Sequence, residues 1–168
     1  LFMFQDEYSM LLFNRRKFIF LFSTLAGCSF APVFKLQNSP KYLKGKIKFP
    51  TPTDRESYVL VSKLEENFGP VERGLFKLSV STSVNKKGFG SLGNISRYNL
   101  PGTASFILTQ VSTGKVIISD QVNTFTSYSA SAQTLATETA ERSARDRLMK
   151  ALADQITTYI NMNYSSDL

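Results

Sequence analysis

The sequence predicts an α+β fold, a two-layer sandwich in which two helices cover one face of a four-stranded, mainly antiparallel sheet. Alternation of apolar and polar residues indicates four strands, and apolar recurrence at intervals of three and four residues indicates two helices. These elements follow one another in the order strand, helix, three strands, helix (β-α-β-β-β-α). The predicted single domain covers residues 41–164, and a short tail follows at 165–168.

The first strand is expected at 43–49, where lysines alternate with apolar or small residues. Three lysines on one face discourage pairing with another sheet edge, so this strand is expected at an edge. Pro50 ends it. Thr53 and Glu56 then form a predicted capping box, and the helix that follows presents an apolar face until Gly69.

Three strands are expected next, at 74–84, 95–111 and 115–128. Pro101-Gly102 interrupts the middle pattern and predicts a bulge or an edge position. A tight turn at Ser112-Thr113-Gly114 joins the last two strands, because glycine readily adopts positive φ. The sheet face opposite the helices is expected to carry Ser, Thr and Lys side chains and to contact water or a polar partner.

The last element is expected to be a long amphipathic helix at 131–161, because apolar residues recur every four positions from Ala132 to Ile160. At 1.5 Å per residue this helix would be about 45 Å long, enough to cross the sheet and project past its edge. Alanine in the first half is expected to allow a close approach to the sheet. Leu, Met and Ile are expected to fill the second half.

The segment before the domain has the order of a bacterial lipoprotein signal. A basic run, Arg15-Arg16-Lys17, precedes an apolar run at 18–27, and small residues stand just before Cys28. The apolar run is too short to cross about 30 Å of hydrocarbon, which needs about 20 helical residues. We therefore predict that Cys28 is the site of lipid attachment.

These boundaries predict a signal peptide at 1–27 and a lipidated tether at 28–40. Residues 1–9 carry Asp6 and Glu7, which do not suit a basic signal segment, so the expected start is Met10 or Met3 and these residues are left out of the predicted fold. Either the general secretory route or the twin-arginine route could export such a chain.

Composition restricts the functional classes. The chain has a formal net charge of +7, no histidine and one cysteine. Ser-His or Cys-His catalysis and imidazole zinc sites are therefore excluded, as is an intrachain disulfide. We expect no enzyme activity, no metal and no cofactor besides the covalent lipid on Cys28. The basic balance favours anionic partners.

Two charged or glycine-rich segments have competing interpretations. Residues 88–93 match the letters of the dinucleotide-binding fingerprint, but a strand follows them instead of a helix, so a hairpin loop is favoured. Lys86 and Lys87 at its base could close on an anionic headgroup. The charged residues between Glu141 and Lys150 are expected mainly as a hydrated surface with weak i,i+4 pairs, and lipid contact is the less favoured alternative. Nucleic acid binding is disfavoured because basic residues are scattered.

Five motifs occur in order along the chain. They are Leu25-Ala26-Gly27-Cys28 followed by Ser29-Phe30-Ala31-Pro32-Val33-Phe34, Ser96-Arg97-Tyr98-Asn99-Leu100, Ser112-Thr113-Gly114-Lys115-Val116, Thr126-Ser127-Tyr128, and the helical run from Ala140 to Ile156. In this order and spacing they resemble the lipopolysaccharide-assembly lipoprotein family (LptE). Pro101-Gly102 and Ala31-Pro32 depart from the pattern usual in that family.

The resemblance implies an outer-membrane lipoprotein, anchored on the periplasmic side. Its partner would be the large LptD-like β-barrel of lipopolysaccharide export, which it plugs and helps to assemble while it helps deliver lipopolysaccharide to the cell surface. The family fold is the two-helix sandwich expected above. By position and charge, Arg97, Lys86 and Lys87 are candidate contacts for the phosphorylated glycolipid.

Two other functions stay open at this point. An auxiliary lipoprotein of an ABC-type lipid or solute transport system would share the signal and the mixed α+β character. An envelope hydrolase is suggested by the serine content, but the chain has no histidine and no paired carboxylates. The outer membrane is favoured because Ser29 follows Cys28, whereas an aspartate there commonly retains lipoproteins at the inner membrane.

Overall fold

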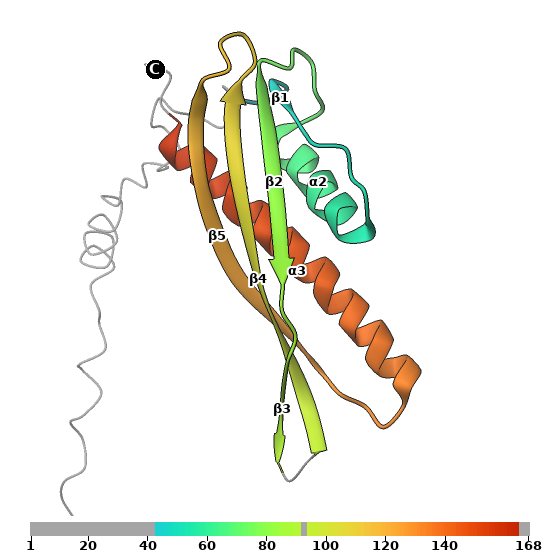
Figure 1. Ribbon diagram of the computed structural model, residues 1–168. Helices are drawn as coiled ribbons and strands as arrows, with labels where there is room; N and C mark the ends of the chain where they lie inside the picture. The colour runs from blue at the N-terminus through green and yellow to red at the C-terminus, as the bar shows by residue number, and fades with distance from the viewer. Residues whose placement is uncertain (1–42, 92–93, 165–168) are drawn as a thin grey trace, which may run out of the picture. The chain divides into compact units, whose positions relative to one another are not determined.

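The computed structural model describes residues 43–91 and 94–164, which all belong to one compact unit. A short strand and a helix precede four further strands, and a long helix ends the fold (Figure 1). The elements are β1 Ile47–Lys48, α2 Arg55–Phe68, β2 Phe76–Val84, β3 Lys87–Ser91, β4 Asn94–Gln110, β5 Val116–Ser129 and α3 Thr134–Asn163. The two helices pack against each other on one side of the sheet, which confirms the predicted α+β class.

β4 is the central strand of the sheet. It pairs antiparallel with β5 on one side and with β2 and then β3 on the other. β1 pairs in parallel with the start of β2, so its predicted edge position is confirmed. The predicted strand at 43–49 is shorter than expected because residues 43–46 form a turn. Gly45 has φ 71° there, and its N–H donates to the Phe68 carbonyl at the end of α2.

β2 and β3 pair one after the other with the same side of β4, and they keep a single register as far as Phe89. β2 ends opposite Gly102 and β3 begins opposite Asn99. Between them, the Asn85 N–H donates to the Pro101 carbonyl at 3.0 Å, but Pro101 has no N–H with which to return the bond. The sheet has five strands where four were predicted, because residues 87–91, which were expected to belong to a loop, form the additional strand β3.

The bulge or edge expected at Pro101-Gly102 does not occur, since both residues pair with β5 in the central strand. The register shift lies elsewhere, between Leu108 and Thr109. Glycine at position 102 instead makes room for α3, because a Cβ there would lie 2.8 Å from Cδ2 of Leu148. This close approach explains why a residue that weakens strands stands in the middle of one.

Part of the glycine-rich segment at 88–93 is strand and not loop. Residues 87–91 pair with β4, and a register shift between Phe89 and Gly90 accompanies the approach to the hairpin. A Cβ at Gly90 would lie 1.8 Å from the Asn94 carbonyl oxygen, so only glycine fits. The prediction that a strand and not a helix follows this segment is confirmed, which argues against a dinucleotide-binding turn.

α2 begins one residue later than predicted. Asp54 is the N-cap: its carboxylate accepts a hydrogen bond from the Ser57 N–H at 2.8 Å, and the Ser57 hydroxyl accepts one from the Asp54 N–H at 3.1 Å. The predicted box of Thr53 and Glu56 is therefore wrong. Aspartate is at least as good an N-cap as threonine, and the side chain of Glu56 is left for a different partner.

The core fills the space between the helices and the sheet, and α3 contributes to it unevenly. Its buried residues begin at Ala144 and end at Ile160. None of residues 134–143 is fully buried, although Ala140 packs partly against the core, and Ala136 is exposed. The expectation that the alanine-rich half would pack on the sheet is wrong for the first residues of α3, because the start of the helix diverges to the side of the strands (Figure 1), whereas Ala140 packs against the core.

Candidate functional site

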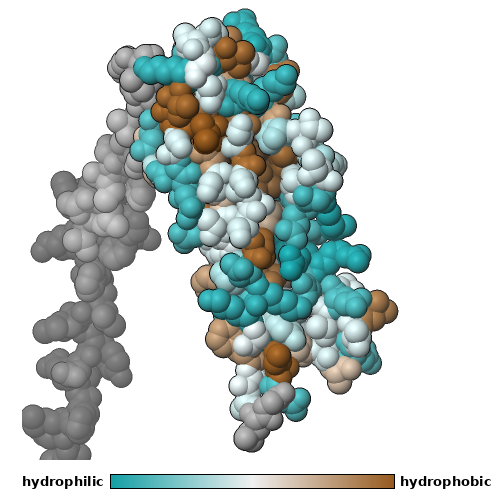
Figure 2. Space-filling view, viewed as in Figure 1, coloured by the Kyte–Doolittle hydropathy of each residue, from teal (hydrophilic) through white to brown (hydrophobic). Residues whose placement is uncertain are grey.

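The sheet has one face that turns away from the helices, which we call the helix-free face. Side chains alternate along a strand, so the odd-numbered residues of β2, most of β4 and most of β5 share this face. Small polar residues dominate it, and Figure 2 shows pale and teal side chains over much of the sheet. They are Ser79, Ser81, Ser83, Asn99, Thr103, Ser105, Ser119, Gln121, Asn123 and Ser127. The polar face expected from the sequence is confirmed.

No carboxylate lies on the helix-free face of the described strands. Their one acidic residue, Asp120, points to the helix side, where its carboxylate accepts a hydrogen bond from the Tyr159 hydroxyl. That hydrogen bond lowers the pKa of Asp120. The helix-free face does carry cations, namely Lys48, Lys77, Lys87 and Arg97. The charged residues that the described strands place on this face are therefore all cationic.

The structure brings two of the three predicted glycolipid contacts together. Phe89 on β3 lies directly opposite Arg97 on β4, and Lys87 lies two residues before Phe89, so the two cations are diagonal neighbours on the helix-free face. Both are exposed. The Arg97 guanidinium donates to the Ser127 hydroxyl on β5 at 2.6 Å, which holds it over the sheet beside the β3–β4 hairpin.

Lys86, the third predicted contact, lies on the opposite face. Its ammonium donates to the carboxylate of Glu141 on α3 at 2.5 Å and lies 4.4 Å from the centroid of the Tyr98 ring. Tyr98 stacks on Tyr128 with ring centroids 5.2 Å apart, and the Tyr128 hydroxyl donates to Glu141. The hydrogen bond to Glu141 raises the pKa of Lys86. The role predicted for Lys86 is untested, and its ammonium already has a protein partner.

Glu141 is the shared acceptor of this cluster. Burial alone would raise the pKa of its carboxyl group, but hydrogen bonds from Lys86, Tyr128 and Arg145 outweigh burial and lower the pKa to about 2. The group is therefore ionised at neutral pH. Its side chain is 22% exposed, so water screens these interactions only partly.

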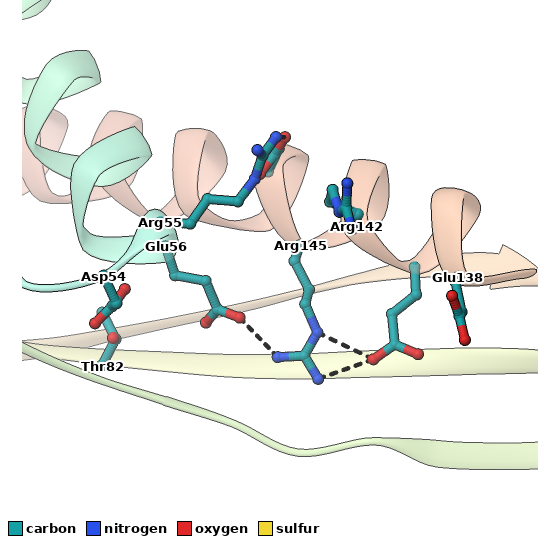
Figure 3. Close-up of a pocket in the computed structure, with 9 residues that line it drawn as sticks. Asp54, Arg55, Glu56, Thr82, Glu138, Arg142 and Arg145 are labelled. Atoms are coloured by element: carbon teal, nitrogen blue, oxygen red, sulfur yellow. Dashed lines mark hydrogen bonds and ion pairs between the residues drawn. The ribbon is translucent and has the colours of Figure 1, made fainter. Parts of the chain in front are cut away.

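Arg145 extends the cluster to α2. Its guanidinium donates to Glu141 at 3.0 and 3.1 Å and to Glu56 on α2 at 2.8 Å (Figure 3). We call Glu56, Lys86, Glu141 and Arg145 the ionic tie, because together they join α2, α3 and the β2–β3 junction. The predicted i,i+4 pairing is confirmed by Glu141 and Arg145. The other two links join residues 55 and 89 positions apart, which no sequence pattern reveals.

An open hollow of about 610 Å³ lies beside the ionic tie, between the start of α2 and the middle of α3 (Figure 3). Charged residues line most of it, and many pair with one another, as Arg55 does with Asp146 at 2.7 Å. Within residues 43–91 and 94–164 no group of three or more His, Cys, Asp or Glu residues could hold a metal ion.

Two further observations concern attachment to a membrane. No helix in the part of the chain that the structure describes is long and apolar enough to cross a bilayer. The predicted signal peptide, the predicted lipid site Cys28 and the predicted tether lie outside the described residues.

Comparison with known proteins identifies the family. A family model described as "LptE: Lipopolysaccharide-assembly" matches residues 49–160. The chain belongs to this lipopolysaccharide-assembly family. The match covers both helices apart from the last residues of α3, and nearly all of the sheet. Its members are membrane-associated lipoproteins and do not form a cofactor-binding family.

Solved structures confirm the family fold. A putative lipoprotein from Caulobacter crescentus CB15 has a TM-score of 0.60 at 18% identity, over 73% of this chain and 93% of that one. A minor lipoprotein from Acinetobacter baumannii has a TM-score of 0.52 at 22% identity, over 70% and 89%. The rare lipoprotein B from Shewanella oneidensis has a TM-score of 0.50 at 14% identity, over 71% and 98%. No curated protein sequence matches this chain.

Proposed function

We propose that this protein is the lipid-anchored, non-catalytic subunit of the outer-membrane barrel that exports lipopolysaccharide. In this proposal Cys28 carries the lipid on the periplasmic side, the folded domain plugs the LptD-like barrel and assists its assembly, and the complex delivers lipopolysaccharide to the cell surface. The observation that carries the proposal is the family match over residues 49–160.

The helix-free face supports the plug part of the proposal. Small hydroxyl and amide side chains can exchange hydrogen bonds with water or with the polar wall of a barrel lumen without burying a charge. This face is mainly Ser, Thr, Asn and Gln, with Ile107 and Phe125 exposed among them, and it has no carboxylate on the described strands, which suits such a surface. An apolar face of the same size would instead favour a dry protein interface or aggregation.

Lys87 and Arg97 are the cations best placed to contact lipopolysaccharide within this proposal. Both are exposed on the helix-free face beside the β3–β4 hairpin. Phosphate groups of the glycolipid would accept charge-assisted hydrogen bonds from the ammonium and the guanidinium. Lys86, in contrast, would first have to leave Glu141.

Affinity purification from solubilised outer membranes tests the partner. We expect the acylated protein to be recovered with one large barrel protein, and depletion of the chain to reduce lipopolysaccharide at the cell surface. Recovery with inner-membrane transporter components, together with unchanged surface lipopolysaccharide, would favour the ABC-type alternative. Recovery of the acylated chain without a barrel would contradict the proposal.

Charge reversal tests the glycolipid contact. Lys87→Glu combined with Arg97→Glu should reduce photocrosslinking of the protein to lipopolysaccharide, because two cations that donate hydrogen bonds to phosphate are replaced by anions that repel it. Recovery with the barrel should be unchanged. Lys150→Glu is the matched control, since this exposed lysine lies on α3 away from the helix-free face. Equal crosslinking by all three proteins would show that the contact lies elsewhere.

A further inference from the structure

A group of exposed apolar residues lies at the end of the helix-free face from which β2 starts, in addition to Ile107 and Phe125 farther along that face. The Val111 N–H donates to the Leu75 carbonyl at 3.0 Å, and Val116 lies opposite Thr109 on β4, so these residues are neighbours. Leu75, Val111 and Val116 are 46%, 55% and 52% exposed. Figure 2 shows brown side chains at this upper end, over the ends of the strands. They form an apolar surface that the described residues leave uncovered.

Cations flank this apolar surface. Lys48 and Lys77 are direct partners in the β1–β2 pairing and are both exposed, so two like charges lie side by side. Such a pair is unfavourable in isolation, because like charges on neighbouring strands repel. Since the described strands place no carboxylate on this face, an external anion is the natural counter-charge. We call Lys48, Leu75, Lys77, Val111 and Val116 the apolar-basic patch.

The described chain also begins at this end of the domain. The Gly45 carbonyl accepts hydrogen bonds from the Glu72 and Arg73 N–H groups at 2.7 and 3.0 Å, and the Phe76 N–H donates to the Lys46 carbonyl at 3.0 Å. The first described residues therefore lie against the start of β2. Leu43, the first described residue, therefore lies at the same end of the domain as the apolar-basic patch.

The length of that route places this end near the membrane. Residues 29–42 separate Cys28 from Leu43. Even fully extended, these residues reach at most about 50 Å, and the 30 residues of α3 add about 45 Å between the end where Leu43 lies and the far end of the domain. With Cys28 held in the bilayer, the patch end is the part of the domain that reaches the lipid surface most readily.

We propose that the apolar-basic patch rests on the anionic surface of the lipid bilayer. The apolar side chains enter the boundary between headgroups and acyl chains, and the two lysines contact lipid phosphates while their stems lie along apolar groups. The proposal rests on the lipid anchor of the proposed function. Because acyl chains already supply the affinity, the patch sets orientation: it directs the β3–β4 hairpin with Lys87 and Arg97 away from the anchoring leaflet.

A single tryptophan tests the contact, because the chain contains none. We would purify the full-length acylated protein carrying Val111→Trp and reconstitute it in phosphatidylethanolamine–phosphatidylglycerol vesicles with brominated acyl chains. Strong quenching of tryptophan fluorescence is expected. Leu135→Trp is the control, since that residue is 76% exposed at the projecting start of α3, and its fluorescence should not be quenched. Equal quenching at both positions, or none at 111, would overturn the proposal.

Charge and partner identity are tested with the same tryptophan. Adding Lys48→Glu and Lys77→Glu to Val111→Trp should abolish the quenching, while adding Lys87→Glu and Arg97→Glu should preserve it. A photocrosslinker at position 111 in intact envelopes should label lipid, and labelling of polypeptide alone would assign the patch to a protein partner and overturn the proposal. Loss of quenching in a protein that still purifies with the barrel removes only this inference. An unacylated Cys28 would overturn both proposals.

Discussion

The two halves of α3 are held to the rest of the molecule by different forces. From Ala144 to Ile160 the helix buries seven residues against the sheet and α2. From residue 134 to 143 it buries none, and the ionic tie at Glu141 and Arg145 makes the connection at the boundary between the halves. A buried Leu stabilises a fold by about 2 kcal/mol, whereas a partly exposed ion pair contributes about 0–1 kcal/mol. The projecting half should therefore detach at lower cost than the packed half.

The largest expected effect is in the packed half. Leu148 is fully buried and lies above Gly102 of the central strand. Leu148→Ala should lower the free energy of unfolding by about 3 kcal/mol, because apolar burial is lost and a cavity remains. Urea denaturation measures it. A loss below about 1 kcal/mol would mean that this half is not the anchor of the helix.

A smaller loss is expected from Gly102→Ala, because the new Cβ would lie 2.8 Å from Cδ2 of Leu148. Overpacking of this kind costs about 1–3 kcal/mol. The double variant Gly102→Ala, Leu148→Ala should lose less stability than the sum of the single variants, since the shortened side chain leaves room for the methyl group. Strict additivity in urea denaturation would contradict the close packing of helix on strand.

The ionic tie should contribute less to the free energy of unfolding than the packing of Leu148 on Gly102. Glu141→Gln removes the charge that Lys86 and Arg145 share, and we expect a loss of about 1 kcal/mol in the free energy of unfolding. Glu138→Gln is the matched control, because Glu138 is one helical turn earlier and has no ion-pair partner among the described residues. Equal losses for the two variants would remove any special role for the tie.

The contribution of Glu141 to the free energy of unfolding should decrease as the pH is lowered. The pKa of Glu141 is lowered from 4.5 to about 2 in the folded protein. Because the folded pKa lies below the unfolded one, this stabilisation is fully present above pH 4.5 and is lost as pH falls toward 2. The stability difference between the parent protein and Glu141→Gln should shrink across that range in urea denaturation. A constant difference would contradict the assigned pKa.

The smallest effect is expected in the projecting half. Leu135 is 76% exposed, so Leu135→Ser should change the free energy of unfolding by less than about 0.5 kcal/mol. Thermal or urea denaturation of the isolated protein checks this. A large loss would show that residues 134–143 are covered in solution, and the contrast between the halves would no longer hold.

Local patterns in the sequence were sufficient for most of the elements. The alternation in 74–84, 95–111 and 115–128 corresponds to β2, β4 and β5, and the four-residue recurrence corresponds to α3. Their boundaries were less accurate. Two equally spaced capping pairs compete at the start of α2, and sequence spacing does not decide between Thr53 with Glu56 and Asp54 with Ser57.

Only part of the candidate site could be predicted from local patterns in the sequence. Alternation places the adjacent Lys86 and Lys87 on opposite faces once residues 87–91 form a strand, but the shared face of Lys87 and Arg97 depends on the register between β3 and β4. The ionic tie was not predicted, because hydrogen bonds between residues 55 and 89 positions apart have no local signal. Such contacts depend on how the elements cross in space.

The sequence by itself determined the fold class, the polar character of the helix-free face and the family resemblance, because periodicity and motif order are properties of neighbouring residues. Tertiary structure alone decided that Pro101-Gly102 lies in the central strand beneath Leu148 and that Lys86 pairs with Glu141. It also decided that Val111 joins Leu75 beside two lysines. The physical reason is that each of these relations requires two distant segments to meet, which strand register and helix packing fix only in the assembled fold.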